Sequence, residues 1–541
     1  MNVHIAQQQS QELAQKLWAI ANDLRGQMDA SRFKDYILGV IFYRYLSERT
    51  ERYMNDLLVD DQISYREALK DSNLAPVVRK YSLDHLGYII EPEYLFASLI
   101  NEINGKEFSI DHLDKAISKL TESTLGQKSE AAFEKLFDDM DLTNKDLGRE
   151  VSERTEKMSK IMLKIADIQF DTENSEIDIL GTAYMILIGL FQSEAGKKGG
   201  EFFTPVCASK LLTRLVTIGL NEIRYACDPC AGSGSLLLQV KEHLTNHKIG
   251  HYYGQEYNGS TFNLLRMNLL MHGVLHHQFT VYNGDTLKHD NFYENGKPIY
   301  FDIQVTNPPF SSHWMPGTEE NEDPRYSAAG AMAPNSYADL AFLEHMVYHM
   351  AEDGRIGIVL PHGVLFRGGK ELAIRKYLIN KLNCIDAIIG LPANMFHGTS
   401  IPACIVILKK KRNGNGNNIL FIDASKDFIK GKNQNSISDE HIDKIVNAYI
   451  ERKDIEKYAH VALLDEIKKN DFNLNIPRYV DTFEKEEGID IKAVAEELNT
   501  INDDIVKETS LFQESLKNLV SENDEVMAGI KMLINVLGEN E

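Results

Sequence analysis

The chain has 541 residues, of which 43% are hydrophobic and 26% charged. These values are typical of globular proteins and exclude wholesale disorder, and at ~150 residues per domain the length predicts three or four domains. Its 80 acidic residues outnumber 58 basic ones, for a net charge of -22. This balance argues against a protein that wraps nucleic acid by itself, because neutralising phosphates requires a basic surface. The protein could still act on DNA through a basic local patch or a basic partner protein.

The cysteine count and the hydropathy indicate an intracellular protein. Five cysteines are too few for a disulfide framework in so long a chain. The first four residues show no basic region followed by an apolar core, so no signal peptide is visible. The most apolar stretch, 179–191, is shorter than the ~18 residues of a membrane span and predicts a buried helix. We therefore expect a cytoplasmic protein without a membrane segment.

The first part of the chain predicts a helical domain over residues 1–170. Leu13, Leu17, Ile20 and Leu24 recur at helical spacing and form one apolar face. Residues 36–45 are apolar almost all round, as in a helix buried inside a bundle.

Beyond Gly196, short β-like runs alternate with helical patterns, which predicts βαβ units and a mostly parallel sheet. We expect this α/β domain to cover 171–410 and to extend to about 480. The predicted strands are 225–227, 251–255, 279–282, 301–306, 354–360, 384–390 and 403–408. The segment 311–339 predicts a long ordered loop, and 409–418 a basic turn or linker.

From residue 481 to 541 the sequence is helical and acidic. Apolar residues follow a heptad-like spacing from Ile491 to Ile505, slip near Phe512 and resume from Leu516. Two interpretations stay open: an amphipathic helix packed on its own domain, or a helix that pairs with a partner subunit.

A glycine-rich turn follows the first predicted strand. Asp228 ends that strand, and Gly232 and Gly234 allow a ligand to approach the backbone before a helix begins near Leu236. No Lys-Ser or Lys-Thr follows the glycines, so the segment is not a P-loop. Taken alone, such a turn is weak evidence for a binding site.

Two further acids occur where the next strands end. Glu256 can accept both ribose hydroxyls of a nucleoside-type cofactor, and Asp285 can accept a hydrogen bond from an adenine amine. An acidic residue at the end of one strand is more often simply solvated. Acids at the ends of three successive strands, Asp228, Glu256 and Asp285, would occur by chance much more rarely.

The segment Asn307-Pro308-Pro309-Phe310 ends the fourth strand. The two prolines fix the backbone and remove two N–H donors, which leaves the Asn307 side-chain carbonyl and the Pro308 backbone carbonyl as rigid acceptors. Such a pair can hold both hydrogens of an exocyclic amine and stabilise positive charge developing on its nitrogen. Phe310 offers a face on which a planar base can stack.

These motifs, in this order, resemble those of amino-group DNA methyltransferases that use S-adenosylmethionine. The segments 20–26, 196–205 and 365–371 and the acidic C-terminal helix narrow the resemblance to the modification (HsdM) subunits of type I restriction–modification systems, with the γ-type motif order. The resemblance covers nearly the whole chain. It implies a Rossmann-like methyltransferase domain, an N-terminal helical domain and a C-terminal long helix.

The resemblance also implies roles for individual residues. Asn307, Pro308, Pro309 and Phe310 are the expected catalytic residues, acting on an adenine flipped out of the duplex. S-adenosylmethionine is the expected cofactor, and we expect no metal, with Cys227 and Cys230 no zinc half-site. The expected cofactor-binding residues are Glu201, Phe202, Phe203, Thr204, Pro205, Val206, Asp228, Ala231, Gly232, Ser233, Gly234, Ser235, Glu256 and Asp285.

The partners implied by the resemblance are DNA, a specificity subunit that binds two modification subunits, and a restriction (translocase) subunit, in the cytoplasm of a bacterium or archaeon. Phe366 is a second candidate for a base contact, with a buried core aromatic as the alternative. Basic residues expected near the catalytic face are Lys197, Lys198, Arg325, Arg367 and Lys370.

Other functions remain open at this point. Asn-Pro-Pro-aromatic sites also occur in methyltransferases that act on a protein glutamine or on RNA, but these fit the long helical N-terminal region poorly. A non-catalytic assembly subunit is disfavoured by the intact motifs. An adenine methyltransferase of a related phage-defence system without a nuclease is the remaining alternative.

Overall fold

The computed structural model describes residues 11–20, 30–168, 179–194, 204–317, 322–396, 399–432, 434–482 and 490–538. The chain forms two compact units, Met1–Asp481 and Thr482–Glu541. None of the helices in these described ranges is both long and apolar enough to cross a bilayer.

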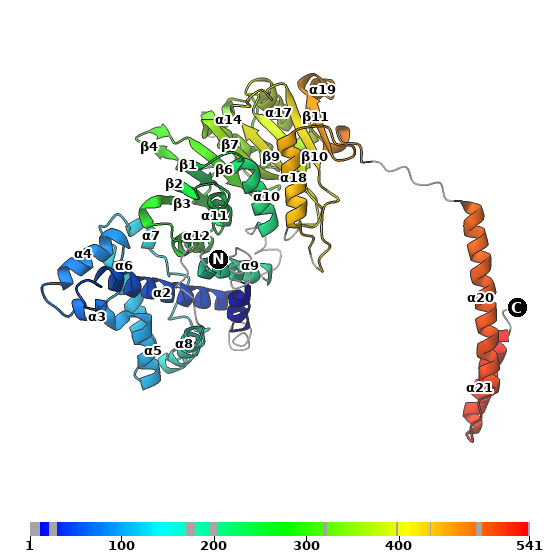
Figure 1. The fold of residues 1–541 in the computed structure, drawn as a ribbon, viewed down its shortest axis with the longest axis horizontal. Coiled ribbons are helices and arrows are strands. Elements are labelled where there is room, and N and C mark those ends of the chain that lie inside the picture. The colour runs from blue at the N-terminus through cyan, green and yellow to red at the C-terminus, as the bar shows by residue number, and fades with distance from the viewer. Residues whose placement is uncertain are drawn as a thin grey trace. The chain divides into compact units, whose positions relative to one another are not determined.

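The N-terminal part of the first unit is helical, as predicted (Figure 1). Its central helix α2 carries the apolar run 36–45, and most of these side chains are buried because neighbouring helices surround them. The helices after the short one at 11–20 are α2 (Ala30–Leu57), α3 (Tyr65–Ala68), α4 (Ala75–His85), α5 (Phe96–Gly105), α6 (Ile110–Ser123), α7 (Glu130–Phe133) and α8 (Val151–Ala166).

A nine-stranded sheet forms the centre of the first unit, in the order β11-β10-β8-β9-β7-β6-β1-β2-β3. All seven predicted strands are present. They are β1 (Glu222–Asp228), β2 (Lys248–Glu256), β3 (Phe279–Asn283), β6 (Phe301–Thr306), β7 (Met350–Pro361), β8 (Ile385–Gly390) and β9 (Ala403–Lys409). The five neighbouring strands β3, β2, β1, β6 and β7 are parallel to one another, and β9 runs antiparallel to both of its neighbours, β7 and β8.

The sheet continues beyond the segment predicted as a linker. β10 (Asn418–Asp423) pairs in parallel with β8, and β11 (Ala459–Leu463) pairs antiparallel with β10. Residues 410–417 therefore connect β9 to β10, two strands of one sheet. Of the two predicted alternatives, a turn or a linker, the structure confirms the turn, because the segment is a surface loop within one domain.

Helices cover both faces of the sheet, as its two apolar clusters show. Helices α10 (Val206–Thr217), α11 (Ser235–Glu242), α12 (Gly259–Met271) and α18 (Asp439–Glu451) contribute to one cluster; α15 (Asp339–Tyr348), α17 (Lys370–Asn380) and α19 (Leu464–Lys469) contribute to the other. Gly357 in β7 permits the close packing of α10, since a Cβ there would lie 2.8 Å from Leu212 and Val216.

The helical part docks on α12, the helix that follows Glu256. Asp139 accepts hydrogen bonds from Ser260 (2.5 Å) and Asn263 (2.8 Å), and Arg266 donates to the carbonyls of Ala131 and Glu134. The predicted buried helix, α9 (Ile179–Glu194), also packs on α12. The N-terminal helices thereby support the part of the sheet formed by β2 and β3, against which α12 packs.

The second unit is a pair of helices, α20 (Ile491–Lys517) and α21 (Asp524–Gly538), which lie side by side as a hairpin (Figure 1). The turn between them comprises residues 518–523, whereas the predicted slip near Phe512 lies within α20, which continues without a break to Lys517. Within these two helices, which are fully described, Leu516 is the one buried residue. Ile491, Val494, Leu498, Ile501 and Ile505 keep between 44% and 79% of their surface exposed.

Candidate active site

The glycine-rich turn lies at the carboxyl end of β1. Gly232 and Gly234 have positive φ angles of 54° and 81°, which side chains with a Cβ adopt at a cost. A Cβ at Gly234 would also lie 2.6 Å from the Leu265 side chain of α12. From the same helix, Asn268 donates a hydrogen bond of 2.7 Å to the Ser233 carbonyl, so α12 holds the turn in place.

Glu256, at the end of β2, reaches across to this turn. Its Oε2 accepts the Gly232 N–H at 2.9 Å and its Oε1 accepts the Asn258 N–H at 2.8 Å. Burial raises the pKa of the Glu256 carboxyl, while these two N–H groups oppose the rise. The second acid of the predicted set is thus part of the same structure as the glycines.

Asp285 follows β3 on the same edge of the sheet. Its Oδ1 accepts the Leu287 N–H at 3.0 Å, and its carboxylate is partly exposed. The adjacent Gly284 N–H donates to the Glu256 carbonyl at 3.0 Å, which ties the two strand ends together. The carboxyl ends of parallel strands meet at one edge, so Asp228, Glu256 and Asp285 line it in the order β1, β2, β3.

The Asn307-Pro308-Pro309-Phe310 segment leaves β6 on the other side of β1. Thr306, the residue before it, donates from Oγ1 to Asp228 Oδ1 at 2.7 Å. The Asn307 Oδ1 atom is buried and has no hydrogen-bond partner among the described residues. The Phe310 ring contacts Phe396 edge to face, with 5.5 Å between centroids. The Thr306–Asp228 hydrogen bond therefore ties the start of this segment to the residue that precedes the glycine turn.

Asp228 connects these two halves of the site. Besides Thr306, its Oδ1 accepts the Cys230 N–H at 2.9 Å. Its Oδ2 is buried and accepts no hydrogen bond from any described residue. Burial raises the pKa of Asp228 to about 7, against the opposing effect of its hydrogen-bond donors. A buried carboxyl with a raised pKa and one oxygen without a described hydrogen-bond partner is typical of a site that binds a polar ligand.

The predicted cofactor segment upstream is only partly described. Glu201, Phe202 and Phe203 lie outside the described residues, as do Lys197, Lys198 and residues 21–26. Thr204 is buried, Pro205 precedes α10, and Val206, the first residue of α10, is 60% exposed. Helix α10 packs against α11, which starts at the glycine turn, so this segment reaches the helix next to the candidate site.

The structure decides the exposure of two residues singled out in the sequence, Arg325 and Phe366. Arg325 is 4% exposed, and its guanidinium is used inside the protein by Asp323 and the carbonyls of Thr286 and Leu287. It is therefore no candidate for a phosphate contact; its charge is taken up in fixing the loop after Asp285. Phe366, in contrast, is 46% exposed, so its interpretation as a buried core aromatic was wrong.

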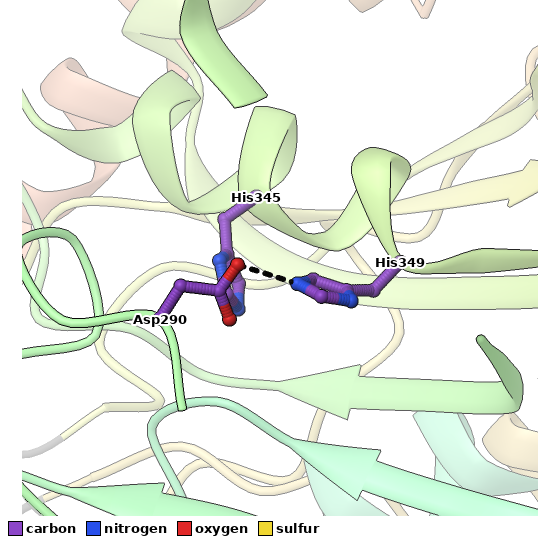
Figure 2. A group of neighbouring side chains, drawn as sticks. All are labelled: Asp290, His345 and His349. Atoms are coloured by element: carbon purple, nitrogen blue, oxygen red, sulfur yellow. Dashed lines mark hydrogen bonds and ion pairs between the residues drawn. The ribbon is translucent and has the colours of Figure 1, made fainter. Parts of the chain in front are cut away.

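A cluster of possible metal ligands lies behind the Asp285 loop. Figure 2 shows Asp290 facing His345 and His349, whose possible ligand atoms all lie within 4.8 Å of one another. His349 contacts Asp290 Oδ2 through Nε2 (2.9 Å) and donates from Nδ1 to the Ile299 carbonyl. Arg325 donates to His345 Nδ1 at 3.0 Å, so a guanidinium already occupies that lone pair. The cluster is held together as a hydrogen-bond network, and we assign it no metal.

The cysteines of the glycine turn belong to different parts of the core. Cys227 packs with Tyr253, Phe292 and Phe301, whereas Cys230 packs against the larger cluster under α15 and α17. Both are free thiols, and burial raises the pKa of each well above its usual range.

Three residues near the site went unnoticed in the sequence: Thr306, Asp339 and Phe396. Thr306 directly precedes the Asn-Pro-Pro motif, and its polar side chain at a buried strand end is the one signal that sequence inspection offers. Asp339 and Phe396 lie 28 and 86 positions from the residues they contact, Ser311 and Phe310, so only the fold reveals them.

Comparison with known proteins agrees with this geometry. Residues 175–488 match the N-6 DNA Methylase family, and residues 13–165 match the HsdM N-terminal domain. The MpnII methylase subunit, a type I restriction enzyme subunit of Mycoplasma pneumoniae, is 35% identical over 95% of this chain and 97% of its own length. The HindI methylase subunit of Haemophilus influenzae is 30% identical over 63% of this chain and 78% of its own.

Among solved structures, the type I restriction–modification methyltransferase subunit of Streptococcus thermophilus is 40% identical to this chain. It superposes with a TM-score of 0.79 and covers 87% of this chain and 100% of its own length. The chain therefore belongs to the N-6 DNA methylase family, as a methylase subunit of the type I restriction enzymes.

Proposed function

We propose that Asn307, Pro308, Pro309 and Phe310 are the catalytic residues with which this methylase subunit methylates the N6 amine of an adenine in DNA. The observation that carries the assignment is the unpartnered, buried Asn307 Oδ1 at the end of β6, linked through Thr306 to Asp228. An acceptor without a donor in a rigid Pro-Pro turn is ready for an exocyclic amine.

The groups at the ends of β1, β2 and β3 fit S-adenosylmethionine. Gly232 and Gly234 provide backbone without Cβ atoms, and the unpaired Asp228 Oδ2 suits the cationic methionine part of that cofactor. Glu256 would bind the ribose hydroxyls and Asp285 the adenine amine. We assign the surrounding contacts to Glu201–Val206 and to Ala231, Ser233 and Ser235.

The protein's own contribution to the chemistry is positioning and charge stabilisation. When bound, S-adenosylmethionine would supply an electrophilic methyl group for the amine nitrogen, with its thioether sulfur as the leaving group. The Asn307 and Pro308 carbonyls would accept both amine hydrogens and stabilise the positive charge that develops on the nitrogen until one proton leaves to water. Phe310, supported by Phe396, would stack on the flipped adenine.

The assembly of the complex is proposed from the two units of the chain. The helical region 1–170 supports the methyltransferase domain, which extends from 171 to about 480. The segment 481–541 would bind the specificity subunit, because its helices expose apolar side chains that they cannot bury in each other. Two such chains would flank one specificity subunit, which reads the DNA sequence, and a restriction subunit would join them for cleavage.

Methylation mapping of DNA from cells with and without this chain tests the proposed reaction. We expect N6-methyladenine at a bipartite sequence in the first case and its absence in the second. Methylated cytosine, or an unchanged methylation pattern, would contradict the proposal.

A further inference from the structure

Two buried aspartates, one at each end, hold the Asn307–Phe310 segment in place. At its start, Asp228 accepts the Thr306 hydroxyl at 2.7 Å; at its end, Asp339 Oδ1 accepts the Ser311 N–H, also at 2.7 Å. The prolines between have no N–H to offer, so the segment depends on its flanking residues for anchoring. Ser311 has a φ of 52°, a left-handed conformation that the surrounding structure must stabilise.

Asp339 is placed for this contact by the first turn of α15. It is fully buried and sits next to Ala338, whose N–H donates to the Ser312 carbonyl at 3.0 Å. A carboxylate is also favoured at a helix N-terminus, where backbone N–H groups are unpaired. The segment after the catalytic loop and the start of α15 are thus bonded through both main chain and side chain.

The other oxygen of Asp339 faces a cation. Arg367 Nη1 lies 3.9 Å from Oδ2, which has no hydrogen-bond partner in the described structure. Arg367 is itself fixed by stacking on Tyr337, 3.9 Å from the ring centre, and by Glu371 at 3.2 Å. The two carboxyl oxygens of Asp339 therefore face different groups, Oδ1 the Ser311 N–H and Oδ2 the Arg367 guanidinium.

We propose that Asp339 is a positioning residue for methyl transfer, which holds the Ser311 amide and thereby fixes Phe310 and the Pro308 carbonyl against the target base. The assignment rests on the proposed function of the Asn307–Phe310 segment. Asp339 lies outside the cofactor-binding groups at β1, β2 and β3, so its loss acts on turnover and not on cofactor affinity.

The test compares Asp339→Ala with Asp339→Asn and with Glu344→Ala. Asn keeps an acceptor for the Ser311 N–H. Glu344 is a matched control because it lies on the same helix, is 4% exposed, and neither of its carboxyl oxygens has a hydrogen-bond partner in the described structure. Each variant is assayed in complex with the specificity subunit for kcat and KM of methyl transfer, for S-adenosylmethionine Kd by calorimetry, and for Tm.

Asp339→Ala should lower kcat by about 10- to 100-fold, since a misplaced catalytic loop costs this much, with an unchanged Kd for S-adenosylmethionine. Asp339→Asn should recover most of the turnover, and Glu344→Ala should keep wild-type kcat despite a lowered Tm. Equal kcat for Asp339→Ala and wild type, or an equal loss in Glu344→Ala, would overturn the assignment, as would an inactive Asp339→Asn. If the wild-type complex transfers no methyl group, the proposed function falls and the role of Asp339 falls with it.

Discussion

Asp228 is the residue on which the two halves of the candidate site converge. One of its oxygens accepts hydrogen bonds from the Thr306 hydroxyl, before the proposed catalytic segment, and from the Cys230 N–H in the glycine turn; the other has no hydrogen-bond partner among the described residues. A single carboxyl therefore fixes the glycine turn relative to the loop that we propose holds the target base. Its loss would disturb both binding and catalysis.

The pKa of Asp228 predicts a pH-dependent cofactor affinity. Burial raises this pKa to about 7, so the carboxyl is protonated at pH 6 and ionised at pH 8 in the free protein. A cationic ligand prefers the ionised form, so S-adenosylmethionine should bind about tenfold more tightly at pH 8 than at pH 6.

Calorimetry across this range measures the effect, with Asp228→Asn as the control that removes the titrating group but not the ligand's own titration. The same pH dependence in both proteins would rule out Asp228 as its source.

The free energy of unfolding should change with pH in the opposite direction to the cofactor affinity. Because the pKa of Asp228 in the folded protein exceeds the unfolded value of about 3.9, the contribution of this group to stability falls as the pH rises from about 4 to 7.

The placement of four of the proposed site residues could be predicted from sequence, because each lies at or just beyond the end of a predicted strand. Asp228, Glu256, Asp285 and Asn307 occur at the ends of β1, β2, β3 and β6, and the parallel order of these strands brings them to one edge. Asp339 was not predictable, because its contact with Ser311 depends on how the long segment between them folds back.

At the level of elements, the turn between β1 and α11 shows why glycine is required at one position. Gly234 combines a positive φ with a distance of 2.6 Å from a built Cβ to Leu265. Gly219 has a similar φ of 73° but no atom within 4 Å of such a Cβ. Comparing a substitution at Gly234 with one at Gly219 therefore distinguishes the free-energy cost of backbone strain, present at both, from the cost of the steric clash, present at Gly234.

Gly234→Ala should therefore destabilise the protein more than Gly219→Ala. Backbone strain alone costs about 1–2 kcal/mol, and the clash with Leu265 adds about 1–3 kcal/mol. Only Gly234→Ala should also weaken S-adenosylmethionine binding, because the turn must shift. Thermal unfolding and calorimetry measure the two effects, and equal Tm values for the two variants would refute the steric argument.

Strands with strong apolar runs were predictable, whereas the edge of the sheet was not. β10 and β11 follow a basic, glycine-rich segment that is typical of a linker, and their membership in the sheet depends on pairing with β8 and with each other. The break between α20 and α21 was not located by the apolar spacing, because the slip near Phe512 lies within α20 and the apolar pattern resumes before the helix ends. The reversal of chain direction depends on the packing of α20 against α21, which spacing alone leaves open.

For the whole molecule, the acidic charge is concentrated in one unit. Residues 481–541 contain 16 Asp or Glu and five Lys, a net charge of -11 out of -22. Half of the excess charge thus belongs to this C-terminal segment, and the exposed apolar side chains of its helices α20 and α21 suit a protein partner and not a phosphate backbone. We infer that the specificity subunit contributes much of the affinity of the complex for DNA.

Substitutions on the hairpin test this division of roles. Leu498→Asp and Ile505→Asp place charges on side chains that are 54% and 57% exposed, and each should weaken binding to the specificity subunit at least about tenfold. Affinity for S-adenosylmethionine should not change. The exposed Asp503→Ala serves as the control, and unaltered affinity of both apolar-face variants in a titration would exclude the hairpin as the interface.

We propose that Asn307 directs methyl transfer to adenine N6. Mass spectrometry tests this role on nucleosides from DNA treated with isotopically labelled S-adenosylmethionine and the complex of this chain with its specificity subunit. Wild type should yield labelled N6-methyladenine, and Asn307→Ala at least about 100-fold less, with cofactor affinity retained. Label in another nucleoside, or equal yields from the two proteins, would contradict the account.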